Sequence, residues 1–308
     1  MGNRYRCAGS ASETYINNER VYDRVDIKSP SLPQNATWDI LSAELNGLLY
    51  IYGFWVSASL WDIYTFDGEH LTKFISTSLL IQSMCTFNNT IYCIGNGELY
   101  RLNGTSFTFV SDIPSDYHNF TNLFVLGNNL YLLFSTNTRD EINHLYRFTG
   151  SSWTEIATSS EAMFYPTCVL YNGAIHIMSY YEMYIYVDNV PVWTIFKIHK
   201  IFNGSSLTDG AQLPGNIQVQ AAYVVNNKLR VFRKITDGEN NVDVYELSGN
   251  TWSGNNALNF DGWANKQLLL DRFNAVYFKN EQYLLSVQGF MMIKVTNPIK
   301  MGQYFISS

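Results

Sequence analysis

Histidine and cysteine are the side chains best suited to metal or nucleophilic chemistry, and here they are scattered along the chain. The five histidines are His70, His118, His144, His176 and His199. The four cysteines are Cys7, Cys85, Cys93 and Cys168, and no two of them have the spacing of zinc ligands. His144 and His199 occupy equivalent places in a repeat described below, which indicates ordinary structural positions. The sequence therefore predicts no metal centre and no cofactor, and it favours reduced cysteines over a Cys85–Cys93 disulfide.

One acidic segment is a candidate calcium site. Asp237, Glu239, Asn241 and Asp243 place oxygen ligands at alternate positions, as a Ca²⁺ loop does. Val242 stands where an EF-type loop has glycine, which favours a solvated hairpin tip.

Other kinds of chemistry find little support. Glycoside hydrolysis needs two opposed carboxylates, and the scattered Asp and Glu residues do not identify such a pair. The turn Gly95-Asn96-Gly97 is followed by no helix that could supply amide donors to a phosphate. The net charge is −6 and no Lys/Arg cluster is present, which argues against a nucleic-acid partner.

The clearest pattern is a repeated hairpin, in which two apolar runs meet at an Asn- or Gly-containing turn. Such turns favour hairpins because their central residues adopt positive φ. The six copies begin at Leu45, Phe87, Leu126, Tyr171, Val225 and Phe278. They recur at roughly 40 to 55 residues, which is typical of propeller blades.

A second hairpin follows each of the first five copies. Its first strand carries two bulky residues at alternate positions before a glycine-containing turn, as in Tyr146-Arg147-Phe148-Thr149-Gly150. A bulky residue often follows: Phe107, Trp153 and Trp252. Two hairpins make four strands per repeat, and four-stranded antiparallel units at this period stack radially into a β-propeller.

The segments Tyr146 to Trp153 and Tyr245 to Trp252 resemble the second half of a Kelch repeat, and the resemblance covers about residues 40–296. The Gly-Gly doublet usual in Kelch repeats is absent; Gly53 and Gly95 stand singly near that position. The resemblance implies an all-β, Kelch-like (galactose-oxidase-type) propeller of six four-stranded blades with degenerate repeats. Copper oxidases with a related propeller need a linked Tyr–Cys pair and two His ligands, which the scattered histidines do not suggest.

We expect one domain over residues 1–308. The expected blades are 40–82, 83–119, 120–163, 164–217, 218–270 and 271–300. The last blade is expected to be completed by an N-terminal strand within residues 20–33, centred on Val21–Ile27. Tyr304–Ile306 is the competing candidate for that place.

Binding is expected on the face that carries the long, dissimilar loops between the second and third strands of each blade. Blade 4 has the longest such segment, Ser179 to Trp193, which is rich in tyrosine. Long strands with aromatics packed between blades are an equally good interpretation of that segment. The predicted partner-binding residues are Tyr180, Tyr181, Tyr184, Tyr117, His118, Trp263 and Arg139.

These patterns predict a non-catalytic scaffold that docks a protein, as part of a larger assembly such as a viral or phage particle. A glycan-binding module that recognises a receptor is one alternative, and a propeller enzyme acting on carbohydrate is another. No signal peptide or membrane-spanning segment is apparent, so a cytoplasmic or virion location without membrane contact is expected.

Overall fold

The computed structural model describes most of the chain as strands and their turns. The described residues are 15–16, 19–20, 24–27, 35–57, 60–114, 120–135, 142–161, 163, 166–187, 190–214, 219–225, 227–233, 241–242, 244–254, 258–259, 273–279, 281–286, 291–297 and 300–306.

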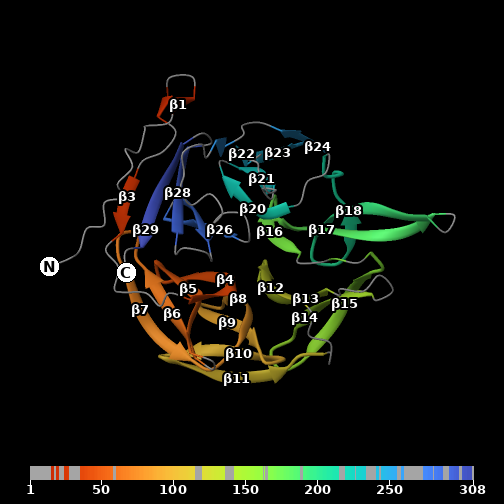
Figure 1. Ribbon diagram of the computed structural model, residues 1–308. Helices are drawn as coiled ribbons and strands as arrows, with labels where there is room; N and C mark the ends of the chain where they lie inside the picture. The colour runs from red at the N-terminus through yellow and green to blue at the C-terminus, as the bar shows by residue number, and fades with distance from the viewer. Residues whose placement is uncertain are drawn as a thin grey trace.

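Five antiparallel sheets of four strands follow one another along the chain (Figure 1). Blade 1 contains β4 (Asn35–Leu45), β5 (Leu48–Ser57), β6 (Leu60–Phe66) and β7 (Leu71–Thr77). Blade 2 contains β8 (Ile81–Phe87), β9 (Thr90–Gly95), β10 (Glu98–Asn103) and β11 (Ser106–Asp112). Blade 3 contains β12 (Phe120–Leu126), β13 (Asn129–Ser135), β14 (Asn143–Phe148) and β15 (Trp153–Ser159). Blade 4 contains β16 (Thr167–Tyr171), β17 (Ala174–Val187), β18 (Val190–Phe202) and β19 (Leu207–Asp209). Blade 5 contains β20 (Val219–Val225), β21 (Lys228–Arg233), β23 (Val244–Ser248) and β24 (Thr251–Gly254).

The last large sheet has five strands, in the order β26-β27-β28-β29-β3. Its strands are β26 (Phe273–Phe278), β27 (Glu281–Ser286), β28 (Met291–Asn297), β29 (Lys300–Ile306) and β3 (Arg24–Ile27). Two small strand pairs lie outside the large sheets: β1 (Tyr15–Ile16) with β2 (Glu19–Arg20), and β22 (Asn241–Val242) with β25 (Leu258–Asn259).

The sheets are arranged as a closed ring, and the first strand of each lies nearest the centre (Figure 1). The first strands contact one another in chain order, and β26 of the last sheet contacts β4 of the first. The predicted all-β propeller of four-stranded antiparallel blades is thereby confirmed. The number of four-stranded blades differs from the predicted six: five sheets among the described residues have that form, and the sixth large sheet of the ring has five strands.

The repeated turns have the backbone geometry that their residues favour. Asn46 and Gly47 have φ values of 53° and 72°, and Asn172 and Gly173 have 49° and 76°. Positive φ at both central residues matches the right-handed twist of the flanking strands, which explains the Asn-Gly preference. These turns fix the register of the first hairpin of each blade.

The closure of the last sheet differs in detail from the prediction. The N-terminal strand β3 does join this sheet, but β29 takes the fourth place, with Phe305 opposite Met291. β3 then adds outside β29 in parallel, with Arg24 opposite Gln303. The competing candidate Tyr304–Ile306 therefore completes the blade, because β29 follows β28 directly and a short antiparallel connection costs little chain entropy.

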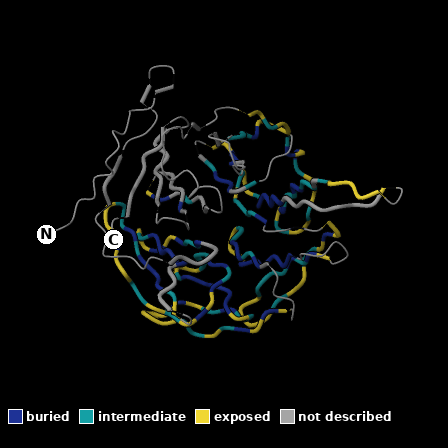
Figure 2. Tube along the Cα trace, viewed as in Figure 1, coloured by how far each residue is buried: buried dark blue, intermediate teal, exposed yellow. Residues whose placement is uncertain are grey.

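The apolar core lies between neighbouring blades, and the buried residues concentrate on the strands nearer the centre of the ring (Figure 2). In five blades an apolar residue near the end of the third strand packs against the preceding blade. These residues are Phe66, Leu102, Phe148, Phe202 and Leu247. Phe202, for example, is fully buried, and its ring centroid lies 5.0 Å from that of Tyr131 in blade 3.

Polar contacts reinforce the same interfaces. The Trp153 indole Nε1 donates to Ser111 Oγ of blade 2 at 3.2 Å. The Trp252 indole Nε1 donates to the Ala211 carbonyl at the end of blade 4 at 3.1 Å. The tryptophan that follows the turn of the second hairpin therefore links each of these blades to the one before it.

The described cysteines are free thiols, in agreement with the expectation. Cys85 lies opposite Tyr92, and Cys93 lies opposite Met84, so the two cysteines do not face each other across the hairpin. Burial raises the pKa of all three described thiols, to about 12 at Cys168. A thiol with a raised pKa is a poor nucleophile and a poor metal ligand.

Replacing Phe202 with alanine should destabilise the protein by about 3 to 5 kcal/mol, because the change removes a buried ring from the contact between blades 3 and 4. Urea unfolding followed by tryptophan fluorescence measures this loss. The matched control is Phe109→Ala, since Phe109 is 55% exposed; we expect it to cost less than about 1 kcal/mol. Equal losses in the two variants would contradict the placement of the core between blades.

Candidate docking surface

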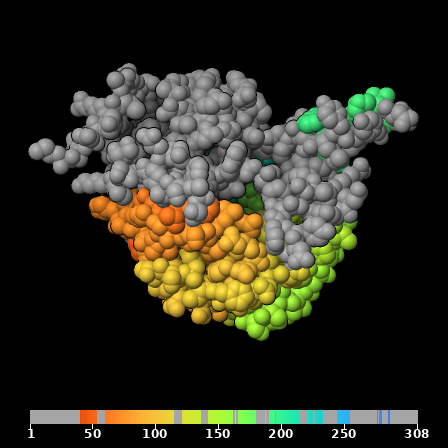
Figure 3. Space-filling view, turned by 60° about the horizontal axis from the view of Figure 1, so that its bottom comes forward, coloured from red at the N-terminus to blue at the C-terminus, as the bar shows by residue number. Residues whose placement is uncertain are grey.

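Blade 4 carries a hairpin that is much longer than its counterparts. β17 pairs with β18 without a break from Ile175↔Phe202 to Val187↔Val190. We call residues 179–197 the arm. Figure 1 shows its strands projecting outward from the ring, and in Figure 3 the coloured residues near its tip lie well away from the blades. It is the one described second-to-third-strand hairpin that extends so far from its blade.

The amino acids of the arm explain why it is extended. β-branched and aromatic residues dominate both strands, in the sequences AIHIMSYYEMYIYV and VPVWTIFKIHKIF. Such residues favour strands because their side chains pack well on a pleated surface. No glycine interrupts either strand, so the pairing continues to its tip.

Apolar side chains are exposed on both faces of the arm. Val187, Val190, Val192 and Trp193 are 49%, 59%, 41% and 50% exposed. Val192 and Trp193 are consecutive, and consecutive strand residues point to opposite faces. Near its tip the arm therefore offers apolar surface on two sides, which is uncommon for a single hairpin on a soluble domain.

The base of the arm is anchored by two buried histidines. His199 Nδ1 donates to the Ala211 carbonyl at 2.8 Å, which leaves His199 Nε2 as an acceptor. His176 Nδ1 lies 2.9 Å from that nitrogen and donates to it. Since the Trp252 indole donates to the same Ala211 carbonyl, the pair also links blade 4 to blade 5.

Both histidines are held neutral. Burial, and secondarily the neighbouring His199, lowers the pKa of His176 from 6.5 to about 4. Burial also lowers the pKa of His199, against the opposing effect of its bond to Ala211. Gly210 packs so closely on the His199 ring that an added Cβ would lie 2.5 Å from Nδ1. If His199 took up a proton at Nε2, that N–H would face the Nδ1–H of His176, and two donors would meet in this closed space.

The predicted site residues divide into two groups. Tyr180, Tyr181 and Tyr184 lie in β17, opposite Lys197, Phe196 and Trp193 in that order. Tyr117, His118, Arg139 and Trp263 lie outside the described residues, as does most of the acidic segment from Asp237 to Asp243. Whether these seven residues contact a partner stays a prediction.

The segment from Ser179 to Trp193 was expected to be a loop or a pair of long strands, and the described part of it is strand. The sequence reasoning missed the exposed Val187, Val190, Val192 and Trp193 because it looked for tyrosines. The Asp188-Asn189 pair between two glycine-free apolar runs is a signal that could have identified a hairpin tip.

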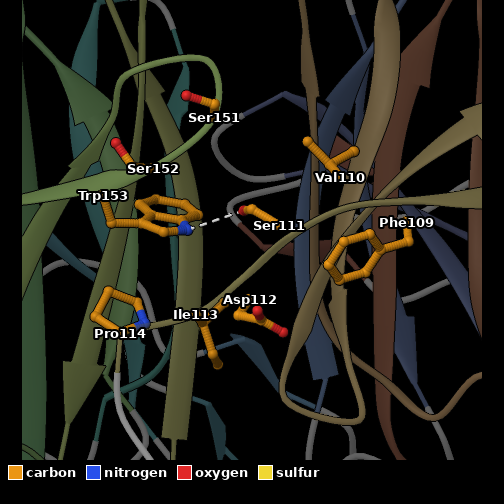
Figure 4. A pocket seen from close by; sticks show the side chains of 9 residues that line it. All are labelled: Phe109, Val110, Ser111, Asp112, Ile113, Pro114, Ser151, Ser152 and Trp153. Atoms are coloured by element: carbon orange, nitrogen blue, oxygen red, sulfur yellow. Dashed lines mark hydrogen bonds between the residues drawn. The ribbon is translucent and has the colours of Figure 1, made fainter.

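A second surface feature is a groove of about 440 Å³ between the outer strands of blades 2 and 3. Its residues are Phe109, Val110, Ser111, Asp112, Ile113, Pro114, Ser151, Ser152 and Trp153. Figure 4 shows Trp153 and Phe109 on opposite sides of Ser111, with Asp112 beside Ile113. The groove combines aromatic surface with hydroxyl groups and a carboxylate.

Neither a metal-binding cluster nor a membrane-spanning helix is found among the described residues. No three His, Cys, Asp or Glu side chains in that part of the chain are close enough together to hold a metal ion. No helix there has the length and apolar character needed to cross a bilayer.

No protein-family model and no curated protein matches this chain, so membership of the Kelch family stays a prediction. Solved structures do resemble it. A structure of YjhT matches 90% of this chain and 98% of its own, with a TM-score of 0.57 and 12% identity. A structure of YCF48 bound to a D1 peptide matches 89% and 84%, with a TM-score of 0.49 and 14% identity. At such identities the likeness to YjhT concerns the fold alone.

The histidine pair predicts a loss of stability in acid. Because the folded pKa of His176 lies below its unfolded value, the unfolded chain takes up protons first. Stability should therefore fall as pH decreases from 6.5 toward 4, by on the order of 2 kcal/mol from this site. Urea unfolding across this range should show a smaller loss for His176→Gln than for the wild type. The control is His144→Gln, a partly exposed position, which should lose as much stability as the wild type. Identical profiles for all three proteins would contradict the assignment.

Proposed function

We propose that this protein is a non-catalytic β-propeller scaffold that docks a protein partner through the arm. The observation that supports the proposal is the exposed apolar surface on both faces of a hairpin that extends beyond its blade. Surface of this kind is costly to leave in water, and on soluble proteins it usually marks an interaction site.

The remainder of the ring suits a supporting role. Adjacent blades share buried clusters and indole hydrogen bonds, so the ring holds the base of the arm rigidly. A rigid base limits the entropy that is lost when the arm binds. Tyr181 and Tyr184, opposite Phe196 and Trp193, are our proposed anchors beside the exposed valines.

The proposal extends to Kelch-like ancestry and to service in a larger assembly, such as a viral particle, and both are compatible with a propeller that has a projecting arm.

Replacing Val192 with serine and Trp193 with alanine should weaken partner binding about 30-fold or more, since anchor residues typically contribute about 2 kcal/mol or more. The wild type and the double variant serve as immobilised baits for proteins from the source organism. The control bait is Leu170→Ser, because Leu170 is 53% exposed on β16 of the same blade but lies outside the arm.

Partner proteins should be retained by the wild type and the Leu170→Ser bait and lost from the double variant. Urea unfolding should show a loss below about 1 kcal/mol for both variants, since the changed residues are exposed. Retention of the same proteins by all three baits would show that the arm is not the docking surface.

Glycan binding is a second candidate, and the groove between blades 2 and 3 favours it. Exposed aromatic rings can stack on sugar rings, and the Asp112 carboxylate with the Ser151 and Ser152 hydroxyls can bind sugar hydroxyls. The Trp153 indole N–H is already bonded to Ser111, so its ring is held in place at the edge of the groove.

A glycan array probed with the labelled protein tests this candidate. If the groove binds sugars, a glycan that the wild type retains should bind Phe109→Ala and Asp112→Asn at least about tenfold more weakly in titration calorimetry. The Val192→Ser/Trp193→Ala variant should bind it normally. Absence of binding to every glycan on the array would exclude this function for the groove.

A further inference from the structure

Among the strands that the structure describes, none lies next to the outer edge of β17 along the arm. Pairing between β16 and β17 ends at Thr167↔Met178, and no other described strand pairs with β17 on that side. On the opposite side, the pairing of β18 with β19 ends at Lys200↔Asp209. In the described chain the arm is therefore a two-stranded ribbon with two open edges.

A ribbon of this kind is physically incomplete. Two strands alone are marginally stable in water, and a third strand or a covering layer is usually needed. Proteins commonly protect open edges with lysine, proline or a bulge. The β18 edge carries Pro191 and Lys197, whereas residues 179–187 of β17 include neither residue type. The β17–β18 register also runs without a bulge, so the β17 edge is regular and suited to strand addition.

We propose that the β17 edge pairs with β17 of a second copy of this chain, antiparallel and about a two-fold axis. The product is a four-stranded sheet in the order β18-β17-β17-β18 across the two copies. This inference rests on the proposed function of the arm and names its partner.

Charge favours a second copy as the occupant. Glu182 is the one charged residue among residues 179–187. If the two-fold axis passes near Met183 or Tyr184, Glu182 lies opposite a tyrosine of the other copy rather than opposite Glu182. Two such edges therefore meet without like charges face to face, which would otherwise oppose pairing. A two-fold contact also closes on itself, so it produces a dimer rather than a filament.

Size favours the same arrangement. The pairing edge, residues 179–187 of β17, is longer than a typical strand of about 5 to 6 residues, so it offers a long row of main-chain hydrogen bonds to a second copy. Four strands is also the number that forms each of the five regular blades. The arm projects from the ring (Figure 1). Pairing through two arms would therefore keep the two rings apart, which reduces repulsion between chains that each carry a net charge of −6.

Light scattering coupled to size exclusion should show the full-length protein as a dimer at micromolar concentration. Replacing Met183 and Ile185 with lysine in one variant, and with glutamate in another, should weaken self-association at least about tenfold in each. Mixing the two variants should restore a dimer, because antiparallel pairing then brings lysine opposite glutamate. The matched control carries lysine at the exposed Phe109 and Leu170, which lie outside the arm, and should remain dimeric.

Restoration on mixing shows that the single variants are folded and that the arms pair with each other. A monomeric wild type would overturn the second copy as partner, while the bait experiment above would still decide whether the arm docks another protein. Undiminished dimerisation of both arm variants, loss of the dimer in the control, or failure of the mixture to associate would each overturn the proposal as well.

Discussion

The burial of apolar surface between neighbouring blades is the interaction on which the rest of the structure depends. Each core cluster combines side chains of two consecutive blades, as Phe202 of blade 4 does with Phe124 and Tyr131 of blade 3. A four-stranded blade has two faces, and neither is covered by a helix in the described residues. Stability therefore comes from stacking, and each blade needs a neighbour on both sides.

This requirement explains the repeated polar details. Trp153 and Trp252 reach back to the preceding blade because an indole offers a large apolar surface with one donor that must be satisfied. The ring is completed in the same way where its two ends meet: Phe66 packs on Phe278, and Lys279 donates to the Asp67 carbonyl. The arm departs from the rule, since its strands continue beyond the blades that could cover them. Local departures of this kind commonly occur at functional sites rather than at positions that stabilise the fold.

The sequence was informative wherever a short pattern determines local geometry. Asn46-Gly47 and Asn172-Gly173 identified the hairpins because few other residues accept their φ values. The blade period and the bulky Trp153 followed from repetition alone. The place of β29 could not be predicted in this way, because Tyr304–Ile306 and the N-terminal strand have equally good strand residues. The direct connection from β28 to β29 decides between them. The exposed valines of the arm were missed because a strand sequence does not reveal whether another layer covers it.

The parallel pairing of β3 with β29 has a consequence for the order in which the protein forms. Every blade from the first to the fifth can assemble from a continuous stretch of chain, one after another, as the polypeptide is synthesised. The β3–β29 contact pairs Arg24 with Gln303, so it cannot form until the chain has been synthesised through β29. Until then the stack of blades is an open arc with apolar surface at both ends. The newly made protein is therefore most vulnerable to aggregation just before the last sheet is complete, and chaperones would have most to do in that interval.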